Sequence, residues 1–222
     1  MCGRFAFYSP AEAAAALFGA HGGTDLKPRY NIAPTQFIAA IRNDEDGNRE
    51  LTEFRWGLVP FWAKDPSIGN RMINARAETV AEKPSFRNAY RKRRCLILAD
   101  GFYEWHTDGG VKVPYYISLA SGEPFAFAGL WEQWQSKESD ESLQTAAIVT
   151  TVANEFLAKL HHRMPVVLGT GGADRWMDGD TELLDHVSEV TPELRAWPVD
   201  RKVNNARNES PDLIDAAGDP IS

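Results

Sequence analysis

CLILADGFYEW, at residues 95–105, is the stretch that decides the fold. Its first part, Cys95–Ala99, is a continuous apolar run of strand length, which predicts a fully buried strand with Cys95 as a core thiol. Asp100 and Gly101 interrupt the run, and a second extended segment, Phe102–Trp105, follows directly. Residues 108–110 (Asp-Gly-Gly) then predict a turn into another strand at 113–119. The centre of the chain is therefore expected to be built from strands.

Further strands are expected on both sides of this stretch, whereas helices are few and short. Asp46–Asn48 predicts a hairpin-like turn between strands at 37–42 and 50–55. Ser9 is expected as an N-cap, with Pro10 at the first position of a helix that reaches Phe18. The other expected elements are strands at 125–131, 145–152, 166–168 and near 197–199, helices at 84–94 and 153–160, short helices around 175 and 183, and a loop at 29–34.

This pattern of elements predicts an α+β fold. We expect a single domain over residues 1–222, built on a largely antiparallel, barrel-like β-sheet with short peripheral helices. The tail beyond about residue 211 is expected to be poorly ordered.

Composition and charge limit the classes of function. The 222 residues are 43% hydrophobic, enough for one packed core, and only two cysteines argue for a reducing compartment without a disulfide framework. No signal sequence and no apolar stretch of about 20 residues is found, so we expect a soluble, cytoplasmic protein without membrane contact. Histidines and cysteines lack zinc-type spacing, and we expect no metal and no cofactor. A net charge of -7 argues against a general polyanion binder, although RNAYRKRR at 87–94 allows a local basic face.

Cys2 follows Met1, and this position gives it a chemistry open to no internal cysteine. Removal of Met1 would leave an α-amine beside the thiol of the same residue. An aldehyde condenses with such an amine to an imine, and the thiol then closes a five-membered thiazolidine ring. The pKa of the amine is about 8 and that of the thiol about 8.5, so both groups are partly in their nucleophilic forms at neutral pH. The alternative is that Cys2 is an incidental, small buried residue.

Three other polar residues lie at the ends of apolar segments, where side chains tend to enter a cleft. Asn74 lies in INAR, Glu104 lies in the second extended segment, and His161 follows the predicted helix at 153–160. Each also has a purely structural explanation: Asn74 satisfies a turn, Glu104 faces solvent from its strand, and His161 caps a helix C-terminus. Taken singly, none of the three decides between the two explanations.

An ordered set of motifs is more specific than any single residue. MCGRF (1–5), RYNIAP (29–34), WGLVPFW (56–62), INARAE (73–78), CLILADGFYEW (95–105) and HHRMPVVL (161–168) occur in this order. The series resembles the SRAP family, the SOS-response-associated, abasic-site processing proteins. His162 departs from the family's pattern, because an acidic residue is usual there. We choose His161 as the site histidine because it keeps the family's spacing to Arg163 and Pro165.

The resemblance implies a catalytic role for four residues. Cys2, freed of Met1, would trap the ring-opened aldehyde of an abasic site as a thiazolidine. Asn74 would hold the N-terminal residue and the sugar. Glu104 would be the general acid and base for Schiff-base formation and for reversal, and His161 would assist proton transfer at the opened sugar. A carboxyl group with a pKa near neutrality suits both proton transfers.

The resemblance also implies a partner, single-stranded DNA that contains abasic sites, including junctions with duplex. The protein would bind it as a monomer, associated with the nucleoid in a bacterium. Arginine suits phosphate, and aromatic faces stack on any base. The implied phosphate contacts are Arg4, Arg76 and Arg163, and the residues that would line the strand are Asn31, Pro34, Trp62 and Thr150.

Two other classes of function remain open. An N-terminal-nucleophile amidohydrolase of the glutaminase type also looks similar at Met-Cys-Gly and attacks an amide with its thiolate, but its other motifs are not found in the sequence. A non-covalent DNA- or protein-binding module would leave Cys2 incidental. The aldehyde-trapping hypothesis itself includes lyase or crosslink-reversal activity and self-processing removal of Met1.

Overall fold

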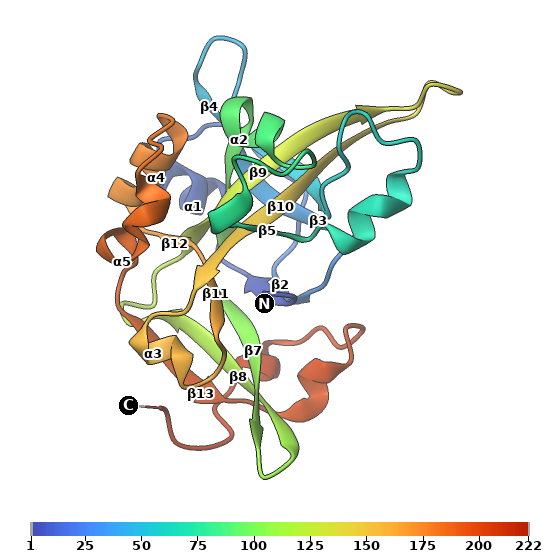
Figure 1. The fold of residues 1–222 in the computed structure, drawn as a ribbon. Coiled ribbons are helices and arrows are strands. Elements are labelled where there is room, and N and C mark those ends of the chain that lie inside the picture. Colours follow the sequence, from blue (N-terminus) through green and yellow to red (C-terminus); the bar gives the residue numbers. More distant parts are fainter. Residues whose placement is uncertain (1, 222) are drawn as a thin grey trace.

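The computed structural model describes residues 2–221 and confirms an α+β fold with a barrel-like sheet, seen in the upper half of Figure 1. The barrel strands follow the order β10-β4-β3-β6-β9, and β9 pairs again with β10, which closes the ring. The pairing of β4 with β10 is parallel, and the other pairings in the ring are antiparallel. The bounds are β3 (Phe37–Asn43), β4 (Arg49–Trp56), β6 (Arg94–Ala99), β9 (Phe125–Gln135) and β10 (Ser142–Val152).

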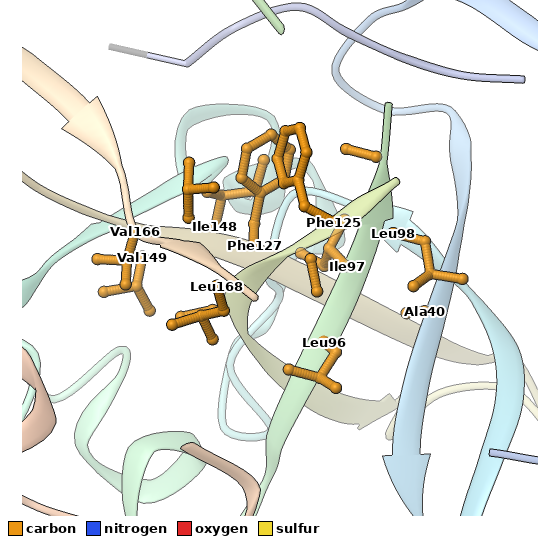
Figure 2. Packing of buried hydrophobic residues seen from close by; sticks show 14 of the residues in the cluster. Ala40, Leu96, Ile97, Leu98, Phe125, Phe127, Ile148, Val149, Val166 and Leu168 are labelled. Carbon is orange, nitrogen blue, oxygen red and sulfur yellow. The ribbon is translucent and has the colours of Figure 1, made fainter. Parts of the chain in front are cut away.

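The apolar run that begins at Cys95 forms a fully buried strand of the barrel, and the burial was predicted. Cys95–Ala99 are fully buried, because β6 lies between β3 and β9 and is also covered by helix α4 (Thr170–Met177). Trp176 of this helix donates its indole N–H to the Cys95 carbonyl oxygen at 3.0 Å. Figure 2 shows the side chains of β6 packed with those of β9 and β10. At Gly129 on β9 a Cβ atom would lie 2.7 Å from the Cys95 sulfur, so this position beside Cys95 requires glycine.

A second, five-stranded sheet lies below the barrel in Figure 1, in the order β13-β8-β7-β1-β2. Its strands are β1 (Phe5–Phe7), β2 (Arg29–Ile32), β7 (Gly101–Asp108), β8 (Val111–Leu119) and β13 (Leu194–Pro198). Asp100 connects β6 of the barrel to β7, and its carboxylate accepts the backbone N–H groups of Tyr8 (2.6 Å) and Ser9 (2.8 Å). This contact fixes the N-terminal strand against the junction of the two sheets.

The remaining elements are short and peripheral, as predicted. The strands are β5 (Asn74–Arg76), β11 (Arg163–Pro165) and β12 (Val167–Leu168). The helices are α1 (Ala11–Leu17), α2 (Arg87–Lys92), α3 (Glu155–Ala158) and α5 (Val187–Val190), with 3-10 turns at Pro66–Arg71, Ala77–Thr79, Leu183–Asp185, Arg201–Asn204 and Pro211–Ile214. Within the described part of the chain, no helix is long and apolar enough to cross a membrane.

Two local predictions for the N-terminal part of the chain were wrong. The expected loop at 29–34 begins with strand β2, because Ile32 pairs with Phe5 and completes the second sheet. Ser9 does not cap helix α1; its hydroxyl donates to Asp100, and Pro10 occupies the cap position.

The tail beyond residue 211 is packed rather than loose. Leu213 is buried, and the backbone N–H groups of Ala217 and Ile221 donate to Pro198 (2.8 Å) and Ala196 (3.0 Å) on β13. The tail thus adds main-chain hydrogen bonds to the outer strand of the second sheet, a pairing that its polar composition did not indicate.

Candidate active site and DNA-contacting residues

The first residues of the chain are held by several elements. Asn74, at the start of β5, donates its side-chain N–H to the Cys2 carbonyl oxygen at 2.8 Å. On the other side, Tyr103 of β7 donates its backbone N–H to the Arg4 carbonyl oxygen at 3.0 Å. Phe5 pairs with β2 and β7. Cys2 is thereby fixed and fully buried where the barrel meets the second sheet.

Glu104 acts electrostatically on the Cys2 thiol. It lies on β7 with 4% of its surface exposed. Burial raises the pKa of the Cys2 thiol well above its ordinary value, and the negative charge of Glu104 raises it further, while the backbone N–H of Arg4 opposes the change. The thiol is therefore neutral at physiological pH, and a nucleophilic thiolate requires a base at the site. Glu104, whose charge acts on this thiol, is itself buried.

His161 follows helix α3 and its ring orientation is set by the backbone. Its Nδ1 atom accepts the backbone N–H of Arg163 at 3.0 Å. The Arg163 carbonyl oxygen lies 3.1 Å from the same Nδ1 atom. His162 stacks on His161 with ring centroids 4.3 Å apart, and the charge of His161 is the main cause that lowers the pKa of His162. His162 is exposed and His161 is half-buried, and the charge of Glu104 acts on His162, so the choice of His161 stays a prediction.

Arg76, Thr150 and Arg163 come together across neighbouring strands. Arg76 on β5 is in register with Thr150 on β10, and Arg163 on β11 donates to the Thr150 carbonyl oxygen at 2.8 Å. Arg76 is exposed, as a phosphate-binding side chain must be. Thr150 is fully buried, so it supports Arg163 instead of lining a strand of DNA directly. Arg163 also makes two contacts with Glu78, at 2.6 and 3.1 Å.

Asn31, for which the resemblance implied a DNA contact, is fully buried in the free protein. Its amide N–H groups lie 2.9–3.3 Å from the carbonyl oxygens of Val203, Asn205 and Asn208. Its Oδ1 atom accepts a hydrogen bond from Arg4 Nη1 at 2.7 Å, and the same Nη1 donates to the Val203 carbonyl oxygen at 2.8 Å. Asn31 therefore joins Arg4 to the C-terminal segment 203–208.

The loop 60–63 carries two exposed aromatic residues. Trp62 is 44% exposed, in keeping with an expected contact to single-stranded DNA, and Pro34 is half-buried. Phe61 is 54% exposed and was missed by the sequence analysis. Its position beside Trp62 in WGLVPFW is the signal that could have identified it. Glu78 was also missed, although it stands two residues after Arg76 in INARAE.

The described residues contain no cluster of three or more histidine, cysteine, aspartate or glutamate side chains arranged to hold a metal ion. Chemically, the site offers a cysteine at the chain start, a buried carboxylate, an imidazole and several guanidinium groups. This set suits acid–base chemistry on an electrophile that is attached to an anionic partner.

Comparison with known proteins gives one consistent result. A family model described as SOS response associated peptidase (SRAP) matches residues 1–206. Abasic site processing protein YoaM of Bacillus subtilis is 42% identical over 225 residues, covering 97% of this chain and 98% of that protein. Abasic site processing protein YedK of Escherichia coli is 31% identical, covering 96% and 99% of the two chains.

Solved structures agree with this match. A crystal structure of a protein from Bacteroides thetaiotaomicron superposes with a TM-score of 0.86 at 26% identity, covering 97% of this chain and all of that one (100%). A protein from Bordetella bronchiseptica gives a TM-score of 0.75 at 26% identity, covering 90% of this chain and 100% of that one.

Proposed function

The chain belongs to the SRAP family, and we propose that it processes abasic sites in DNA by trapping them covalently through Cys2. The single observation that carries the proposal is the hydrogen bond from Asn74 to the Cys2 carbonyl oxygen, with the Cys2 thiol in range of the Glu104 charge. A cysteine without a role at the site would need no side-chain hydrogen bond to its backbone carbonyl group. Met1, whose removal the chemistry requires, lies outside the described residues, and we infer its removal either by an aminopeptidase or by self-processing.

The reaction has two bond-forming steps. The α-amine of Cys2 adds to the aldehyde of the ring-opened sugar, and loss of water gives an imine. The thiol then gives its proton to the Glu104 carboxylate that the loss of water leaves, and the sulfur attacks the carbon of the imine, which is protonated on nitrogen, so that the thiazolidine ring closes. Glu104 donates the proton that leaves with water and accepts the thiol proton, and His161 assists proton transfer at the opened sugar. The same groups acting in reverse give crosslink reversal or lyase activity.

Contacts to DNA are assigned to the side chains that reach the surface near the site. Arg4, Arg76 and Arg163 contact phosphates, and Trp62 stacks on unpaired bases or at a junction with duplex. Pro34 lines the strand, whereas the buried Asn31 and Thr150 act through Arg4 and Arg163. Such a local surface allows a monomer with a net charge of -7 to associate with single-stranded DNA.

The experiment is an intact-mass measurement after incubation with single-stranded DNA that carries one abasic site. Protein lacking Met1 is expected to form a heat-stable adduct with loss of one water and without added reductant, and Cys2→Ala is expected to form none. An adduct that requires reductant and persists in Cys2→Ala would replace the proposal with a lysine Schiff base. If protein confirmed to lack Met1 forms no adduct, the covalent proposal is refuted, and glutaminase assays and DNA-binding assays then decide between the two other classes.

A further inference from the structure

Both terminal nitrogen atoms of Arg163 have partners within the protein. Its Nη1 atom contacts Glu78 Oε1 at 2.6 Å, and its Nη2 atom contacts Glu78 Oε2 at 3.1 Å. Nη2 also donates to the Thr150 carbonyl oxygen at 2.8 Å. Only 11% of the Arg163 side chain is exposed, whereas 44% of the Glu78 side chain is exposed. The carboxylate therefore covers the guanidinium from the solvent side, and Thr150 supports it from the protein side.

A DNA phosphate would need the same guanidinium edge. Carboxylate and phosphate both bind arginine through paired N–H···O hydrogen bonds, so they compete for Nη1 and Nη2. Glu78 stands in the short turn Ala77–Thr79, which follows the exposed Arg76. Its hydrogen bond to Arg163 is the main cause that lowers its pKa, and the charge of Arg76 lowers it further. The partly exposed Glu78 carboxylate can be hydrated when it leaves, and the incoming phosphate replaces its negative charge beside the largely buried Arg163 guanidinium. The contact to Thr150 would hold Arg163 in place after that exchange.

We propose that Glu78 occupies the phosphate position on Arg163 in the free protein and is displaced by a phosphate of the bound strand. Glu78 is then a residue that determines specificity, because it weakens binding to any phosphate chain that does not reach deep enough to replace it. The inference rests on the proposed function, in which Arg163 binds phosphate.

The test measures non-covalent affinity for intact single-stranded DNA, which has no aldehyde and so separates binding from chemistry. Glu78→Gln is expected to tighten binding by roughly two- to fivefold, the range set by a partly exposed ion pair. The slope of affinity against salt concentration should not change, because the number of phosphates bound is the same. Glu82→Gln is the matched control: it removes one negative charge from an exposed residue four positions along the chain and is expected to have a smaller effect. Glu78→Ala repeats the test with the side chain shortened.

Arg163→Ala distinguishes failure of the inference from failure of the proposed function. It is expected to weaken binding and to abolish the gain from Glu78→Gln in the double variant. Weaker binding by Glu78→Gln would mean that Glu78 orients Arg163, and equal gains from Glu78→Gln and Glu82→Gln would mean a general charge effect; either result overturns the inference. If Arg163→Ala binds as tightly as the unmodified protein, the assignment of Arg163 as a phosphate ligand is itself wrong.

Discussion

Replacement of Asn31 by alanine separates a structural role from direct DNA contact. The substitution removes one hydrogen bond from the charged Arg4 and the amide donors that reach the carbonyl groups of Val203, Asn205 and Asn208. A hydrogen bond to a charged group contributes about 1.5–3 kcal/mol and a neutral one about 1 kcal/mol, so we expect a loss of about 3–5 kcal/mol in the free energy of unfolding. For a domain of this size that loss corresponds to a melting temperature lower by about 6–20 °C.

Calorimetry and hydrogen exchange test this prediction together. The amides of segment 203–208 should exchange faster in Asn31→Ala, and affinity for single-stranded DNA should fall because Arg4 loses one of its two fixed acceptors. Asn31→Asp keeps an acceptor for Arg4 but removes the amide donors, so it should loosen the segment while retaining more DNA affinity. A variant with unchanged melting and exchange but weaker DNA binding would refute the reasoning, because Asn31 would then contact DNA directly.

Three further predictions follow from the site and the core. Glu104→Gln should slow crosslinking by about 10²–10⁴-fold, because the general acid and base is lost. The same change removes a negative charge that raises the pKa of the Cys2 thiol, so alkylation of Cys2 at alkaline pH should become faster. Parallel changes in the two rates would contradict the assignment. Trp62→Ala should weaken binding of intact single-stranded DNA by about 1–3 kcal/mol in a fluorescence titration and leave melting unchanged, because the ring is 44% exposed. Gly101→Ala would bring a Cβ atom to 2.2 Å from Cζ of Tyr116. We expect the free energy of unfolding, measured with denaturant, to fall by about 3 kcal/mol, and Tyr116→Leu should restore part of it. Unchanged stability would show that β7 and β8 can move apart to accept the methyl group.

Local patterns were enough to predict most of the strands. The run Cys95–Ala99 is buried on both sides and therefore uniformly apolar, which makes it visible in the sequence. The sequence predicted a barrel-like sheet but not which strands close it. Closure depends on the parallel pairing of β4 with β10, in which Arg55 pairs with Thr145, about ninety positions later in the chain. No short-range pattern encodes such a partner.

The order of the motifs predicted Asn74, Glu104 and Arg163 as site residues, and their roles stay predictions. It did not predict the contacts among the residues of the site. It did not distinguish a side chain that reaches the surface from one that holds another in place, as Asn31 does for Arg4. The pairing of Glu78 with Arg163 joins residues 85 positions apart and was equally hidden. Both facts depend on which strands become neighbours in the folded chain.

The site joins the first residues of the chain to some of its last, and this has a consequence for synthesis. Arg4 is held by the carbonyl group of Val203, a connection that spans 199 residues. At bacterial or eukaryotic rates of translation, on the order of 5–20 residues per second, the interval between these two positions is about 10–40 s. On the proposed chemistry, the ribosome therefore carries a nascent chain whose cysteine is open to cellular aldehydes before Asn74, Glu104 and the C-terminal segment can enclose it. Rapid translation of this chain would shorten that exposure.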